Sequence, residues 1–186
     1  MADDRGLEED GVVGVWPITL ALHELGRGAT QRRIIAEGPA RVRIAAALDL
    51  VELKSLDADL RVTPWLDGAE VAGRWSAVVV QICGITLEPF ESTLAGEVAV
   101  RAVPSGSSAL AVEPEHELEL DPDADDPPDE IMDGVVPLGA YVVEDLSLAI
   151  DPFPRKPGVE FKAPDGPAEP SPFAVLARLR DTDAKS

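Results

Sequence analysis

Cysteine and histidine are scarce in this 186-residue chain, which has one cysteine and two histidines. A single cysteine cannot form an intrachain disulfide. A zinc site needs about four ligands, and Cys83 with His23 and His116 does not supply them. We therefore expect no disulfide, no metal and no cofactor.

A glycine-rich phosphate loop is also missing. Neither the segment 26–28 nor the segment 105–107 is followed by a helix that would aim its amides at a phosphate. His116 lies among glutamates, which is typical of a solvated residue rather than a catalytic base. Since no catalytic constellation is present, we expect that the protein is not an enzyme.

Long apolar runs are absent as well. The most apolar stretch, 71–87, is interrupted by Arg74 and Gln81 and is typical of a strand, not of a membrane span. The first ten residues are acidic, whereas a signal peptide begins with basic residues and continues with apolar ones. The sequence therefore predicts a soluble protein of the cytoplasm.

Positive charge is in short supply: 16 basic residues face 35 acidic ones, and the formal net charge is -19. Such a chain repels nucleic acid and anionic membranes, so we expect no DNA, no membrane and a basic or neutral partner. Only 4% of residues are aromatic and 17 are prolines, which favours one domain with a modest core and irregular connections.

The densest β-branched run lies between residues 78 and 103. Apolar residues occupy both faces before Cys83, which predicts a strand that is buried on both sides at the centre of a sheet. Within such a strand Cys83 is expected to be a small buried hydrophobe, not a nucleophile. After Pro89 the pattern alternates, with Val98 and Val100 on one face and Glu97 on the other, as in a strand with one wet side.

Alternation predicts further strands. Between residues 56 and 66 the even-numbered positions are mostly apolar, and Asp67-Gly68 then favours a tight turn with positive φ and an antiparallel return strand over 71–83. Weaker patterns predict an edge strand over 16–22, a strand over 30–36 and a short edge strand at 135–136.

Prolines introduce the predicted helices. One is expected from Pro39 to about residue 50, with Val42, Ala45, Ala46 and Asp49 at helical spacing, and a second from Pro137 to about residue 150. The apolar face of the second helix should pack on the sheet and consists of Val142, Val143, Leu146, Ala149 and Ile150, while Glu144, Asp145 and Ser147 face water. A short third helix is expected after Ser171.

The predicted fold class is therefore α+β: an antiparallel sheet of five to seven strands, two main helices packed on it, and a short C-terminal helix on a flexible tail. We expect a flexible acidic terminus over 1–13, a single domain over 14–154 that contains an acidic loop at 104–130, and a proline-rich tail over 155–186. Segments 104–130 and 155–170 are expected to be mobile, because neither buries enough apolar surface to offset ordering entropy.

The acidic loop invites a calcium interpretation. Asp121, Asp123 and Asp125 alternate as at the start of an EF-hand loop. The sixth position of that loop is Asp126 instead of glycine, and the twelfth is Met132 instead of glutamate. Calcium binding is therefore disfavoured.

Three motifs follow one another in the second half of the chain. The first is CGITLEPF at 83–90, the second runs from Asp133-Gly134 to the proline pair Pro152 and Pro154, and the third is PFAVLARL at 172–179. In order and spacing they resemble the YceD family of large-ribosomal-RNA-subunit accumulation proteins. The motif positions are Cys83, Thr86, Leu87, Glu88, Pro89, Leu138, Gly139, Glu144, Leu148, Pro152 and Pro154.

The resemblance implies a non-enzymatic factor in biogenesis of the large ribosomal subunit that supports accumulation of 23S rRNA. The family's second cysteine is Thr86 here, so a role for a cysteine pair cannot apply, and the geometry of the turn is the expected shared feature. The implied partners are ribosome-assembly components, and the negative charge favours a basic ribosomal protein or assembly factor over direct contact with bulk rRNA.

Several residues are candidates for partner binding. Local basic patches could contact rRNA, although adjacent arginines are more often a solvated face, and apolar residues of the predicted C-terminal helix could anchor a partner or dock on the domain itself. These candidates are Arg32, Arg33, Arg41, Arg43, Arg155, Lys156, Phe173 and Leu176. The alternative function is an acidic interaction module that mimics nucleic acid through residues 113–133, which hold eleven acidic residues and no lysine or arginine.

Overall fold

The computed structural model describes residues 12–110 and 127–161. The elements, in chain order, are α1 (Val12–Val15), β1 (Leu20–Ala21), the 3-10 turn η1 (Leu22–Glu24), β2 (Thr30–Ile35), α2 (Gly38–Ala47), β3 (Glu52–Trp65), β4 (Gly68–Ile82), β5 (Pro89–Pro104), the 3-10 turn η2 (Ser108–Leu110), β6 (Asp129–Ile131), β7 (Val135–Val136) and α3 (Leu138–Ala149).

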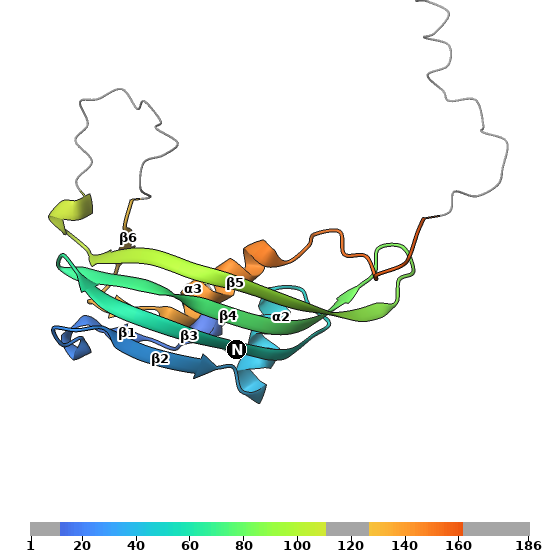
Figure 1. Ribbon diagram of the computed structural model, residues 1–186, viewed down its shortest axis with the longest axis horizontal. Helices are drawn as coiled ribbons and strands as arrows, with labels where there is room; N and C mark the ends of the chain where they lie inside the picture. The colour runs from blue at the N-terminus through green and yellow to red at the C-terminus, as the bar shows by residue number, and fades with distance from the viewer. Residues whose placement is uncertain (1–11, 111–126, 162–186) are drawn as a thin grey trace, which may run out of the picture.

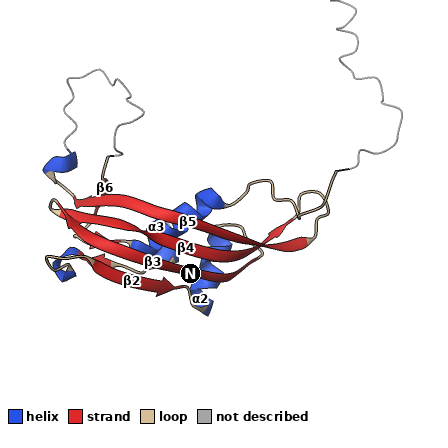
Figure 2. Ribbon diagram, in the orientation of Figure 1, coloured by secondary structure: helices blue, strands red, loops and turns tan. Residues whose placement is uncertain are grey.

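The main sheet has five strands in the order β2-β3-β4-β5-β6, so β4 lies at its centre as predicted. The pairings from β2 to β5 are antiparallel, whereas β5 and β6 pair in parallel. The long strands β3, β4 and β5 run side by side along the molecule (Figure 1). Strands and helices together give the predicted α+β class (Figure 2).

The alternation of β3 decides which of its faces is buried. Leu56, Ala58, Leu60 and Val62 are almost fully buried, and the intervening residues face outward. Leu66 does not continue this face, because its side chain is exposed. Its backbone is left-handed, with a φ of 51°, as is the backbone of Asp49, with a φ of 53°. The two-residue turn is therefore Leu66-Asp67, one residue earlier than predicted.

Gly68, expected in the turn, is the first residue of β4. A Cβ at this position would overlap the backbone carbonyl oxygen of Ala102 in β5. Glycine is thus needed for close approach of two strands, and not for a positive φ.

Consecutive residues of β4 are buried only at its two ends. Before Cys83, Val79 and Val80 are buried, but Val78 is half-buried and Ile82 is exposed, so the prediction that this stretch is buried on both sides was wrong in part. Cys83 is fully buried, one residue beyond the strand. Earlier in β4 one face is wet, because the helices cover only the other face of the sheet.

Helices α2 and α3 contribute to one hydrophobic core with the inner faces of β3, β4 and β5. In α2 the buried residues are Ala40, Ile44 and Ala45, whereas Val42 is exposed, so the predicted apolar face of this helix was wrong in part. The predicted face of α3 is confirmed at Val142, Val143 and Leu146 but not at Ala149, which is exposed.

The N-terminal segment differs most from the prediction. Residues 16–22 form no edge strand of the main sheet: only β1 is extended, and it pairs with β7 in a separate two-stranded sheet. Trp16 and Leu20 are nevertheless buried in the core. The chain here is held by α3, since the Gly139 amide donates to the Ile18 carbonyl at 2.9 Å.

The predicted acidic loop is shorter than expected, because it contains η2 and the strand β6. The terminus predicted to be flexible over 1–13 lies outside the described residues up to residue 11, and α1 already begins at Val12. The calcium-like segment 121–126 and the predicted C-terminal helix with Phe173 and Leu176 also lie outside the described residues. Over the ranges that are described, no helix is long and apolar enough to cross a membrane.

Candidate functional site

The first motif folds into a turn that joins β4 to β5. Its Cys83 sulfur accepts hydrogen bonds from the backbone amides of Thr86 at 3.5 Å and Lys156 at 3.4 Å. The Thr86 hydroxyl accepts a bond from the Glu88 amide at 3.4 Å. Thr86 therefore takes part in the turn through its amide and its hydroxyl, as expected if the motif specifies the geometry of the turn.

The same turn holds the segment that follows α3. Gly84 donates its amide to the Pro154 carbonyl at 2.9 Å, and Lys156 pairs with Glu88 at 3.3 Å. The tail predicted to begin at residue 155 is thus attached to the domain at its start. Leu87, with a φ of 58°, is exposed and makes the left-handed step of the turn.

The amide donors of Lys156 and Thr86 lower the pKa of the Cys83 thiol from 9.0 to about 6, although burial opposes this change.

We predict that the thiolate absorbance of the native protein titrates with a midpoint near pH 6. A group with a lowered native pKa stabilises the fold fully above its unfolded pKa and loses that contribution as the pH falls through 6. The difference in melting temperature between the wild type and Cys83→Ala should therefore shrink as the pH is lowered from 9 to 6, and a midpoint above 8 would contradict the assignment.

The second motif separates into structural and exposed positions. Leu138 is buried, and Gly139 lies against the backbone of Trp16. Pro152 and Pro154 line a small pocket with Gln81, which donates to the Asp151 carbonyl at 3.2 Å. Glu144 and Leu148, in contrast, are exposed on the outer side of α3.

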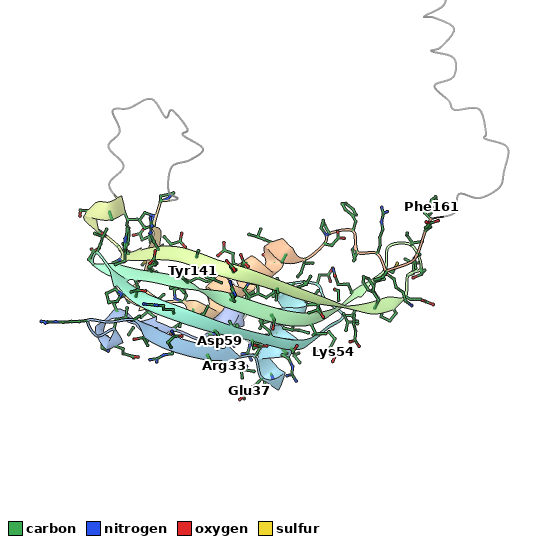
Figure 3. All side chains as sticks on the ribbon, viewed as in Figure 1. Arg33, Glu37, Lys54, Asp59, Tyr141 and Phe161 are labelled. Carbon is green, nitrogen blue, oxygen red and sulfur yellow. The ribbon has the colours of Figure 1, made fainter. Side chains whose placement is uncertain are left out.

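The predicted basic patches do not form one surface. Arg33 lies 3.8 Å from Asp57 and 4.0 Å from Asp59, so its charge is offset by the neighbouring strand (Figure 3). Arg41 and Arg43 donate to backbone carbonyls of Ala36 and Val15. Arg32 on β2 lies on a different part of the molecule from Arg155 and Lys156, which follow α3.

A cleft of about 620 Å³ runs between β5 and α3. Its walls come from β4, β5, the start of β6 and the outer side of α3, and its acidic side chains are Glu70, Glu97, Asp129, Glu144 and Asp145. Arg101 is the basic residue among those that line it. Glu70 pairs with Arg101 at 3.4 Å and Glu97 with Arg74 at 2.9 Å.

A second cleft of about 590 Å³ adjoins the first on the other side of β6. The two share Asp129, Tyr141 and Glu144, and the second adds Glu130 and Asp133 with no lysine or arginine among its lining residues. We call the two clefts together the acidic groove. Asp129 and Glu144 are exposed, so they present full negative charge to a partner.

Tyr141 connects the two halves of the acidic groove, because it lines both clefts. Its side chain is only 6% exposed, and its hydroxyl makes no hydrogen bond of normal geometry with the described residues, although the Asp129 carboxylate lies close enough to interact with it. Burial raises the pKa of the hydroxyl well above its usual range, and the carboxylates of Asp129 and Glu144 raise it further. The neutral hydroxyl can both donate to a carboxylate and accept from a cation.

The chemistry of the acidic groove favours an organic cation. In the part of the chain that the structure describes, no group of three His, Cys, Asp or Glu side chains converges closely enough to hold a metal ion. A guanidinium or ammonium group needs less convergence, because it brings several donors of its own that carboxylate and hydroxyl oxygens accept.

Part of the acidic groove was predicted from the sequence. Glu144 and Leu148 are motif positions, and Asp129, Glu130 and Asp133 belong to the acidic segment 113–133 of the alternative function. Tyr141 and Glu97 were not predicted, and the local signal near Tyr141 is the acidic pair Glu144-Asp145 one turn later on the same helix.

No family model, curated protein or solved structure matches this chain. The resemblance to the YceD family thus depends on the three motifs and stays a prediction.

Proposed function

We propose that this protein is a non-enzymatic, cytoplasmic factor in assembly of the large ribosomal subunit, and that it supports 23S rRNA accumulation by binding a basic protein partner in the acidic groove. The observation that carries the proposal is the groove itself, where carboxylates from β4, β5, β6 and α3 line the two clefts that meet at the buried Tyr141 hydroxyl. The link to the ribosome comes from the motif resemblance.

Charge supports a basic protein over RNA as the partner. Glu144 and Asp129 would repel phosphates at the groove, and Arg33 is already paired with Asp57 and Asp59. Lys and Arg side chains of a ribosomal protein would gain from the negative potential of the groove and of the whole chain.

The test is complementation in cells that lack the chromosomal copy. We expect that the double variant Asp129→Asn/Glu144→Gln restores less 23S rRNA than the wild type, because it removes two exposed groove charges that lie beside Tyr141. The control Glu24→Gln/Glu37→Gln changes the net charge equally at exposed sites outside the groove and should complement fully. Equal complementation by both double variants would show that the groove has no part in this function.

Affinity capture of the full chain distinguishes protein from RNA. Capture of a basic large-subunit protein that persists after nuclease treatment is the expected result. Loss of the captured material on nuclease treatment would favour direct rRNA binding through the basic patches instead.

The acidic mimic remains the alternative function. The carboxylates Asp129, Glu130 and Asp133 of its proposed segment line the groove, which favours contact with a basic surface in either case. Under this alternative the captured protein would be a nucleic-acid-binding protein, and nucleic acid would compete with its binding.

A further inference from the structure

The free edge of β5 lies directly beside the acidic groove. Strand β5 pairs with β4 along its whole length, but on its other side it pairs with β6 only at Ala102–Pro104. Within the described residues, no strand pairs with this edge from Pro89 to Val100. Backbone groups along such an edge are available to an incoming strand.

Strand β6 shows how an added strand is accommodated. It lies parallel to β5 with Ala102 opposite Asp129 and Pro104 opposite Ile131. The cleft continues this position along β5, since Val98, Ala99 and Val100 line one wall and Tyr141, Glu144 and Leu148 of α3 line the other. An extended segment placed there would pair with β5 and direct every second side chain toward α3.

The groove carries the charge that such a side chain would meet. Asp129 and Glu144 are exposed and lie beside the Tyr141 hydroxyl, which is buried and makes no hydrogen bond of normal geometry in the described parts of the chain. A guanidinium seated there could donate to both carboxylates and to the hydroxyl oxygen, while the hydroxyl donates to a carboxylate.

We propose that the partner binds as an extended basic segment that adds a strand to the free edge of β5 and seats an arginine or lysine between Asp129, Tyr141 and Glu144. This inference rests on the proposed function, because it specifies how the basic partner is bound. It predicts a partner sequence with basic residues at alternate positions, since only those side chains face α3.

The charge of the chain's own segment 111–126 does not complement the acidic groove. Residues 111–126 join β5 to β6 and contain no lysine or arginine, so their charge has the same sign as the groove. Strand β2 of a second copy carries Arg32 and Arg33 and is the competing occupant that the experiment must distinguish.

The probe is a nine-residue peptide of alternating arginine and threonine, measured by calorimetric titration into the full chain. Peptide amides that face β5 all belong to one alternating set, so N-methylation of that set should weaken binding by about tenfold or more, while N-methylation of the other set should change it by about twofold or less. Equal effects of the two N-methylated peptides would overturn strand addition, as would failure of the unmodified peptide to bind.

Tyr141→Phe tests the seat without removing a charge. It should weaken peptide binding by about fivefold or more, and it should change the melting temperature little, because the deleted buried hydroxyl makes no hydrogen bond of normal geometry with the described residues. Unchanged affinity would show that Tyr141 is only a core residue. The control Glu37→Gln, which lies outside the groove, should bind like the wild type.

Self-association has its own signature. A concentration-dependent dimer that the peptide dissociates would show that a second copy occupies β5, contrary to the proposal. Failure of the two methylated peptides to differ, together with full loss of complementation by the groove double variant, would reject strand addition while leaving the proposed function in place.

Discussion

Replacing Trp75 with alanine is expected to lower the free energy of unfolding by about 3–5 kcal/mol, as for other buried aromatic residues. Trp75 lies in the central strand β4 and is 3% exposed. Its indole Nε1 donates to Asp145 Oδ2 of α3 at 2.5 Å, so the side chain fills the core and ties the helix to the sheet. Chemical denaturation followed by circular dichroism measures the effect.

The neighbouring Gly96 makes this contact possible. It is opposite Trp75 in β5, and a Cβ there would lie 2.5 Å from Asp145 Oδ2 and 2.7 Å from the indole ring. Because Trp75→Ala removes the hydrogen bond to Asp145, it should also loosen the packing of α3 beside the acidic groove.

Trp65 is the matched control for Trp75. It is half-buried at the end of β3, where the Arg101 guanidinium lies 5.3 Å from its ring centroid. Trp65→Ala should cost about 1 kcal/mol, in keeping with an exposed cation–π contact. Equal losses for the two variants would show that Trp75 does not anchor α3.

The strands of the hairpin could be predicted because their signal is local. Apolar residues occupy every second position from Leu56 to Val62 without interruption, and a period of two that is this regular is typical of a strand with one buried face. The second main helix could be predicted for a similar reason, since Val142, Val143 and Leu146 fall on one side of a helix.

The prediction of an edge strand over 16–22 was wrong in part, because apolar residues at alternate positions can also be buried by a distant helix. Trp16 and Leu20 are buried, but Ile18 between them is exposed, and Trp16 lies against α3, more than a hundred residues later. No local sequence pattern indicates a contact between segments so far apart in the chain, and the same holds for the parallel pairing of β5 with β6.

The acidic groove as a whole was missed for the same physical reason. Its carboxylates come from β4, β5, β6 and α3, and each looks like an ordinary exposed acidic residue within its own element. The net charge of -19 leads us to expect a basic or neutral partner, which stays a prediction, whereas the position of the groove depends on tertiary contacts.

Replacing Gly139 with alanine is expected to destabilise the protein by about 1–3 kcal/mol, although alanine is the better helix former. A Cβ on Gly139 would overlap the carbonyl oxygen of Trp16, and backbone atoms cannot rotate away as a side chain does. Either α3 or the N-terminal segment must then shift, which also weakens the bond from the Gly139 amide to Ile18. Thermal unfolding measures the loss.

Gly38 gives the opposite control at the start of the other main helix. Nothing lies within 4 Å of a Cβ built there, and its backbone is not left-handed. Gly38→Ala should thus stabilise the protein by up to about 1 kcal/mol through helix propensity and a less flexible unfolded chain. If Gly139→Ala destabilises the protein and Gly38→Ala stabilises it, the close approach of Trp16 to α3 explains the glycine of the motif. A stabilising Gly139→Ala would contradict that packing.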